Sequence, residues 1–338
     1  MKKVSVIILN WNGEALLRKF LPSVCRYTCS ELAEVVVADN GSDDGSLQML
    51  ATEFPHIRVI SFPKNYGFAE GYNRAIDQVD SEYVVLLNSD IEVTPDWVQP
   101  LVEYADSHPE VSALQPKMKS FTHRDYFEYA GAAGGYIDHW GYPYCRGRIF
   151  ETVEKDAGQY NSVADIFWAT GACLFVRTDD YRKAGGLDVH FFAHMEEIDL
   201  CWRLNRMGKR IVCVPQSTVY HVGGATLQMG SSHKIYLNFR NNMLMLYKNL
   251  PVSERRHLML KRKMLDGLAA MMFLLKGKLQ NCVAVYHAHR DATKMIEKYY
   301  RQNPVASLPV HVQKSEYYNR SIVVDYYLRR KRFFSELK

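Results

Sequence analysis

The stretch YVVLLNSDIEV, from Tyr83 to Val93, changes character at three polar residues. An apolar run typical of a buried strand leads directly into Asn88, Ser89 and Asp90. A carboxylate at the end of such a strand has two interpretations: an ordinary turn, or a ligand for a divalent cation that carries phosphate. Small polar neighbours are compatible with a turn and with a cation site, so the residues at the other strand ends are needed to distinguish the two interpretations.

Three more apolar runs end in polar residues. These residues are Asn10 and Asn12 after the first run, Asp39, Asn40 and Asp43 after the second, and Asn65 with Gly67 after the third. Each cluster alone is most simply a loop rich in turn-forming residues. Ligands of an open α/β sheet bind beyond the carboxyl ends of its strands, so four clusters at one edge predict a polar ligand there.

The elements that would position these residues alternate along the first part of the chain. Apolar runs at 4–9, 34–39, 57–62 and 83–88 predict strands, and segments with helical spacing separate them. This order predicts an α/β fold with an open, mostly parallel, doubly wound sheet.

The second part of the chain has a different pattern. From about Ser120 it loosens into a stretch rich in Gly and aromatic residues, which predicts loops or irregular strands. After Ser231 it becomes helical and basic. We therefore expect one α/β domain over 1–230 and a C-terminal helical extension over 231–338.

Phosphate would have to be held without a known phosphate-binding loop. The chain contains neither G-x-G-x-x-G after its first strand nor G-x-x-x-x-G-K-[ST], which excludes the dinucleotide fingerprint and the P-loop. Mg²⁺ or Mn²⁺ on Asp90 would serve instead, because these ions are often bound by one or two carboxylates plus substrate phosphates. The carboxylate of Asp39 could accept hydrogen bonds from a nucleobase or a ribose hydroxyl.

An ordered set of segments then carries a family resemblance. The segments are VSVIILNWNG, VVVADNGSDDGS, NYGFAEGYNRAI, VVLLNSD, GACLFVR, GGLD, FFAHMEEIDLCWR and VYHVGGAT. In this order they resemble the family-2 glycosyltransferases of the nucleotide-binding GT-A fold, and most of all the branch that includes bacterial rhamnosyltransferases. The resemblance spans roughly residues 3–250.

The resemblance implies roles for individual residues. Asn88-Ser89-Asp90 matches the family's D-x-D-type motif with Asn in the first position, so Asp90 would bind the metal and His221 would complete the site. Alone, His221 would be read as a strand-end histidine without a ligand, and Trp168 as a core residue. The residues expected to bind the donor are Asn10, Asn12, Asp39, Asn40, Asp43, Gly67, Gly71, Asn73, Arg74, Asn88, Ser89 and Trp168.

The acidic cluster Glu196, Glu197 and Asp199 is expected to supply the general base. Sugar transfer with inversion needs a carboxylate that removes the acceptor proton, and the family places it in an acidic pair whose second position here is Glu197. Glu196 is the second candidate. Arg203 follows Asp199 by four residues on the expected helix. An ion pair between the two side chains would therefore explain Asp199 equally well.

The resemblance thus implies an inverting, metal-dependent hexosyltransferase of bacterial polysaccharide or cell-wall biosynthesis. It would move a sugar, rhamnose in this branch, from a dTDP- or UDP-sugar to a hydroxyl of a growing glycan on a saccharide acceptor that is often lipid-linked. Two alternatives stay open: a nucleotidyltransferase on a similar sheet, and a catalytically silent protein that binds nucleotide sugars.

Composition limits the remaining partners. The seven cysteines are scattered and odd in number, which favours reduced thiols, and no apolar run is long enough for a signal core or a membrane span. Residues 254–338 carry 18 Lys and Arg and 7 Asp and Glu, a net charge of +11. No nucleic-acid module accompanies these cations, so nucleic acid is not an expected partner. We expect a cytoplasmic protein whose basic helical extension either contacts the inner face of the plasma membrane or forms a solvated cap on the catalytic domain.

Overall fold

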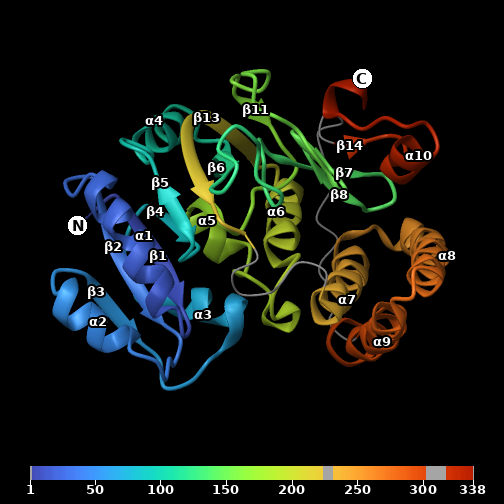
Figure 1. The fold of residues 1–338 in the computed structure, drawn as a ribbon, viewed down its shortest axis with the longest axis horizontal. Helices are drawn as coiled ribbons and strands as arrows, with labels where there is room; N and C mark the ends of the chain where they lie inside the picture. Colours follow the sequence, from blue (N-terminus) through green and yellow to red (C-terminus); the bar gives the residue numbers. More distant parts are fainter. Residues whose placement is uncertain (1, 224–230, 302–316, 338) are drawn as a thin grey trace.

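The computed structural model describes residues 2–223, 231–301 and 317–337, and within them a nine-stranded sheet forms the centre of the molecule (Figure 1). The strand order is β11 (Ala164–Asp165), β13 (Arg210–His221), β6 (Val111–Ser120), β12 (Cys173–Arg177), β4 (Tyr83–Leu87), β1 (Val4–Asn10), β2 (Ala33–Asp39) and β3 (Arg58–Ser61), with β5 (Ile91–Val93) paired to β13. The predicted α/β fold with a mostly parallel sheet is therefore confirmed.

The first four strands of the chain are parallel and end together. In the register of β1 and β2, Asn10 lies opposite Asp39, and in that of β2 and β3, Asp39 lies opposite Ser61. β12 is antiparallel to both of its neighbours, β4 and β6. The parallel half of the sheet thus brings its polar strand ends to one edge.

Helices cover both faces of the sheet, which is why its central strands, such as β1 and β4, are largely apolar. One face packs against α1 (Glu14–Tyr27), α2 (Ser46–Glu53) and α4 (Gln99–Ser107), and the other against α3 (Gly67–Ile76), α5 (Thr178–Lys183) and α6 (Glu196–Arg206). In β1, Val6 and Ile8 belong to the first core and Ile7 to the second, as the two-residue period of a strand requires.

A second, smaller sheet forms where the sequence predicted loops or irregular strands. Its order is β10 (Thr152–Val153), β9 (Arg148–Ile149), β8 (Pro143–Cys145), β7 (Gly135–Asp138) and β14 (Tyr317–Tyr318). β14 comes from the C-terminal segment and pairs in parallel with β7. The end of the chain is therefore built into the α/β domain.

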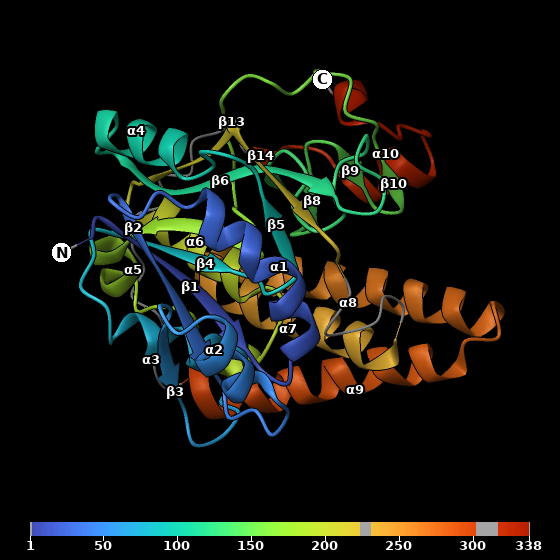
Figure 2. The ribbon, with the colours of Figure 1, turned by 60° about the vertical axis from the view of Figure 1, so that its left-hand side comes forward.

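Three helices of the extension lie beside the main sheet: α7 (Ser232–Asn249), α8 (Val252–Leu275) and α9 (Leu279–Met295), which continues as a π-helical turn over Ile296–Tyr300. Figure 2 shows α8 and α9 running side by side away from the domain. None of the described helices is long and apolar enough to cross a bilayer.

The C-terminal segment also contains α10 (Ile322–Tyr327), which ends in the first two residues of the basic and aromatic stretch YYLRRKRFF. Several of its side chains face the domain and not solvent. Tyr326 is buried, and the ring of Phe334 packs on that of Tyr136 with centroids 5.0 Å apart. Arg332 stacks over Tyr326 at 3.9 Å. Only part of this stretch is therefore free to meet a membrane.

Candidate active site

A cavity of about 1070 Å³ opens at the carboxyl ends of the parallel strands. The strand-end residues that line it are Trp11, Asn12, Asn40, Asn65, Asn88, Ser89 and Asp90. Those lining it from the loop before α6, from α6 itself and from the first turn of α7 include Phe192, His194, Glu196, Glu197 and Lys234. The four polar strand ends and the acidic pair thus meet around one space.

Asp39 lies beneath this cavity and stabilises its floor. The side chain is fully buried; its Oδ2 accepts from Nδ2 of Asn10 and its Oδ1 from the backbone N–H of Ser42, both at 3.0 Å. Asp39 and Asn10 are not among the residues that line the cavity in the described structure. Their predicted contact with a nucleotide stays a prediction.

Asn40 joins the loops that follow β2 and β3. Its Nδ2 donates to the carbonyl of Gly67 at 3.1 Å and to Oδ1 of Asn65 at 3.0 Å, while its Oδ1 accepts from the N–H of Tyr66 at 3.0 Å. Gly67 has a φ of +79°, and a Cβ there would lie 3.1 Å from the ring of Phe192. The turn before α3 therefore needs glycine for its backbone conformation and for its fit against the opposite wall.

His221, at the end of β13, lies between two carboxylates. Its Nε2 is 3.1 Å from Oδ1 of Asp90, and its Nδ1 is 3.2 Å from Oε1 of Glu128. All three side chains are buried at the cavity wall. Burial opposes a charge on the imidazole, but Glu128 and Asp90 outweigh it and raise the pKa of His221 to about 10.

Asp90 and His221 fit a divalent cation as a pair. A carboxylate oxygen and an imidazole nitrogen 3.1 Å apart face the cavity, and Glu128 on the opposite nitrogen would fix the ring, as carboxylates do behind metal-binding histidines. Among the described residues, no group of three or more His, Cys, Asp or Glu side chains could hold a metal. A cation here would therefore complete its shell with phosphate oxygens and water.

Glu196 and Glu197 begin α6 at the cavity. Oε2 of each is buried without a hydrogen-bond partner in the described structure, and Glu197 is the more exposed of the two residues. Burial raises the pKa of both carboxyl groups, and the charge of Glu197 adds to the rise at Glu196. A partly exposed carboxylate with a raised pKa is suited to accept a proton from a substrate hydroxyl.

The loop before α6 is strained. Phe192, His194 and Met195 all have positive φ, at 68°, 70° and 73°, a conformation that costs a residue other than glycine about 1–3 kcal/mol. Nδ2 of Asn241 in α7 lies within hydrogen-bonding distance of three loop carbonyls, those of Phe191 at 2.9 Å, Ala193 at 2.8 Å and His194 at 2.7 Å. A helix of the extension therefore holds the loop that presents the acidic pair.

Asp199 occupies a different environment from the glutamates. It is fully buried, and its Oδ2 lies 2.8 Å from Nζ of Lys248 and 2.9 Å from Nε of Arg203. Burial alone would raise the pKa of Asp199, but these two cations lower it below its usual value. Asp199 is not among the described residues that line the cavity, and its ion pairs join α6 to α7.

Other residues expected at the donor site lie behind it. Asn73 binds the backbone of Leu187, Arg74 pairs with Glu70, and Trp168 donates its indole N–H to the carbonyl of Tyr136. The residues predicted to bind the donor that do not line the cavity in the described structure are Asn10, Asp39, Asp43, Gly71, Asn73, Arg74 and Trp168. Ala225 and Thr226 of the VYHVGGAT segment lie outside the described residues.

Sequence reasoning missed Glu128, His194, Lys234 and Asn241. Glu128 lies in the Gly- and aromatic-rich stretch, 93 positions from His221, and has no local pattern to distinguish it. Burial lowers the pKa of His194 to about 4, with Lys234 and His233 contributing, so this cavity histidine is neutral. For Asn241, the nearest available signal was the paired Asn241-Asn242 directly before the apolar run MLML.

Comparison with known proteins agrees with this geometry. A family model described as glycosyl transferase family 2 matches residues 5–167. A Mycobacterium tuberculosis protein named N-acetylglucosaminyl-diphospho-decaprenol L-rhamnosyltransferase is 27% identical over 234 residues, 64% of this chain and 75% of the relative. Rhamnosyltransferase WbbL of Escherichia coli K12 is 24% identical over 229 residues, 64% and 83% of the two chains.

Solved structures show the same fold. GalNAc-T7, determined with UDP, GalNAc and Mn²⁺, superposes with a TM-score of 0.59 at 15% identity, covering 92% of this chain and 58% of the other. Fold and relatives together define a sugar-transferring enzyme of the GT-A fold. The chain is similar to the family-2 glycosyltransferases, and to the rhamnosyltransferases among them.

Proposed function

We propose that this enzyme is an inverting, metal-dependent glycosyltransferase that moves a sugar from a nucleoside diphosphate to a hydroxyl of a growing cell-surface glycan. One observation carries the proposal: the Asp90–His221 pair and the Glu196–Glu197 pair line the same cavity. A site for diphosphate and a site for proton removal are thus present together, as sugar transfer needs.

Glu197 is the proposed general base. Its carboxylate takes the proton from the acceptor hydroxyl while that oxygen forms a bond to the anomeric carbon of the donor. The bond from that carbon to the diphosphate oxygen breaks, and its electron pair leaves with the nucleoside diphosphate. Glu197 is preferred over Glu196 because it is less buried, and because its charge further raises the pKa of Glu196, which favours the protonated form of that neighbour.

Asp90 and His221 are the residues that would hold Mg²⁺ or Mn²⁺. The cation would neutralise charge that develops on the departing diphosphate. The Mn²⁺ named with GalNAc-T7 supports this choice of metal. Lys234, in the first turn of α7, adds a cavity-lining cation that suits an anionic leaving group, and burial keeps its pKa below the ordinary value.

Rhamnose, carried by dTDP or UDP, is the proposed donor sugar, and a lipid-linked saccharide is the proposed acceptor. The names of the two bacterial relatives support rhamnose, and the decaprenol in one of them supports a lipid-linked acceptor. A reaction on such an acceptor would take place at the inner face of the plasma membrane. The match to the family-2 glycosyltransferases supports sugar transfer over the nucleotidyltransferase, whereas a silent binding protein would bind donor without turnover.

The first experiment is a thermal-shift screen against nucleoside diphosphates and nucleotide sugars, with and without Mn²⁺, followed by turnover of the ligands that bind. A ligand that binds only the folded state raises the melting temperature. We expect Mn²⁺-dependent stabilisation, and turnover that is lost in Glu197→Gln while donor binding is kept. Stabilisation without turnover in the unmodified enzyme would support the silent alternative. Full turnover in Glu197→Gln would move the base to Glu196.

A further inference from the structure

The hairpin of α8 and α9 exposes an apolar stripe that the described part of the chain does not cover. On α8 the stripe consists of Leu260, Met264, Leu268, Met271, Met272 and Leu275, and on α9 it continues with Leu279, Val283 and Tyr286. The spacing of four, four, three and four residues from Leu260 to Leu275 keeps the α8 members on one helix face. Leu275 is 82% exposed and Met264 68%, so the stripe faces away from the protein.

The opposite side of the hairpin is anchored by buried polar contacts. Asp266 accepts from Nη2 of Arg262 at 3.2 Å and lies 3.0 Å from Nε2 of His289 on α9. The guanidinium of Arg262 stacks 3.6 Å over the ring of Tyr142 in the α/β domain. The hairpin is therefore oriented by its inner face, and its apolar stripe is free for a partner.

The charge around the stripe is of one sign. Residues 255–290 contain eight Lys and Arg and a single carboxylate, Asp266, which is fully buried. Lys263, Lys276 and Lys278 are exposed beside the stripe, the last two in the turn between the helices. An apolar face with exposed cations and no exposed carboxylate complements an anionic lipid surface.

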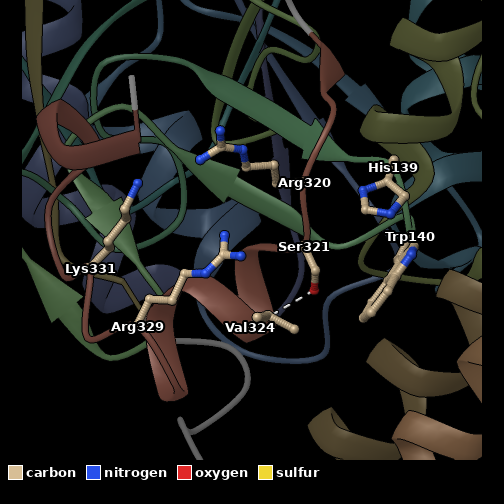
Figure 3. Close-up of a pocket in the computed structure, with 7 residues that line it drawn as sticks. All are labelled: His139, Trp140, Arg320, Ser321, Val324, Arg329 and Lys331. Carbon is tan, nitrogen blue, oxygen red and sulfur yellow. Dashed lines mark hydrogen bonds between the residues drawn. The ribbon is translucent and has the colours of Figure 1, made fainter.

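A basic pocket of about 500 Å³ adjoins the hairpin (Figure 3). It is lined by His139, Trp140, Arg320, Ser321, Val324, Arg329 and Lys331, three of them cations and none of them carboxylates. Nζ of Lys261 on α8 lies 5.9 Å over the ring of Trp140, which places the pocket next to the hairpin. The cationic surface thus continues from α8 onto the C-terminal segment.

We propose that the α8–α9 hairpin docks flat on an anionic membrane surface, with its apolar stripe in the headgroup layer and its lysines on lipid phosphates. This inference rests on the proposed function only in that a lipid-linked acceptor places the reaction at a membrane. A helix that lies in the interface needs no membrane-spanning length, in agreement with the helices described above.

Vesicle flotation of the full-length protein tests the proposal. The vesicles are phosphatidylcholine alone, or phosphatidylcholine with phosphatidylglycerol. We expect binding to the anionic vesicles, weakening with salt, and a loss of about tenfold in Met264→Gln/Leu268→Gln, since each change exposes polar atoms to the lipid. The matched control is Leu47→Gln/Val59→Gln, which alters two exposed apolar residues on the main domain and should bind like the unmodified protein.

Three outcomes would overturn the docking proposal: no binding to either vesicle, equal binding by both double variants, or a stable dimer that Met264→Gln/Leu268→Gln dissociates in analytical ultracentrifugation. The last would assign the stripe to a second copy of the chain. Donor binding by thermal shift is measured on the same samples. If it is intact while flotation fails, only the docking is wrong; if donor does not bind at all, the proposed function fails independently.

Discussion

At the scale of single residues, His221 is the point where the candidate site is most sharply defined. It has Asp90 on one ring nitrogen and Glu128 on the other, so the position of the imidazole depends on both carboxylates. Of these two carboxylates, only Asp90 belongs to the predicted motif at the end of β4. Glu128 would act through His221, as a positioning residue behind the metal.

We predict that Glu128→Gln weakens Mn²⁺ binding by about 10–100-fold, because loss of an outer-shell carboxylate leaves the ring less well oriented and less basic. Titration calorimetry of Mn²⁺ into the complex with a nucleoside diphosphate measures this affinity. Glu151→Gln is the control, since Glu151 is another cavity-lining carboxylate that makes no contact with His221 within the described structure. Equal affinities for Mn²⁺ in both variants would refute the role of Glu128.

The glutamate pair predicts a pH profile. A base must be ionised, and burial raises the pKa of Glu197 above its ordinary 4.5, so kcat/KM should fall as the pH drops through that raised value. The charge of Glu197 further raises the pKa of Glu196, so Glu196 still carries its proton where Glu197 ionises, and Glu196→Gln should leave the acid limb in place. Glu197→Gln should lower kcat by about 10²–10⁴-fold at every pH. An acid limb that disappears in Glu196→Gln would show that Glu196, and not Glu197, is the base.

At the scale of elements, the regular half of the fold was predictable and the small sheet was not. Strands β1, β2 and β4 are largely buried on both faces, so their apolar runs stand out from the helices between them. β7 to β10 are two to four residues long and rich in Gly and aromatic residues, too short for a period to show. The site shows the same contrast. The residues at the strand ends could be predicted from the apolar runs before them, whereas Asn241 could not, because the loop that it contacts lies 47–50 positions away in the sequence.

The contact between α7 and the strained loop predicts a catalytic defect. Asn241→Leu keeps the side-chain size but removes the donors to three loop carbonyls, so we expect kcat to fall about tenfold to hundredfold while the donor KM changes little. Asn242→Leu is a matched control, because this neighbour is also buried but donates to Gly141 outside the loop. Each variant should lose about 1–3 kcal/mol of stability, and only Asn241→Leu should lose turnover. Equal kcat values in the two variants would show that the contact is structural only.

At the scale of the whole molecule, the extension and the α/β domain are joined by buried charge. Lys248 of α7 lies 2.6 Å from Asp188 and 2.8 Å from Asp199, and the hydroxyl of Tyr300 donates to Asp188 at 2.8 Å. Burial alone would raise the pKa of Asp188, but Lys248 and the hydrogen bonds lower it well below its usual range. The segments before and after the boundary predicted near residue 231 therefore pack against each other through these buried charges.

We predict that Lys248→Met lowers the free energy of unfolding by about 3–5 kcal/mol, because two buried carboxylates lose their shared cation. Urea denaturation measures the change, and Lys263→Met, an exposed lysine of α8, should stay within about 0.5 kcal/mol of the unmodified protein. Asp188 and Asp199 have lowered pKa values, so their contribution is complete above about pH 4 and is lost as the pH falls further. A Lys248→Met variant with unchanged stability at neutral pH would refute this account.

Because Asn241 holds the loop before α6, the order in which the chain is synthesised determines when this loop can be fixed. The strands whose ends line the cavity leave the ribosome first, and residues 232–249, which fix the acidic pair, follow much later. At about 5–20 residues per second, residues 232–249 are added several seconds after the first four strands. The loop that carries Glu196 and Glu197 can therefore be held in place only late in synthesis.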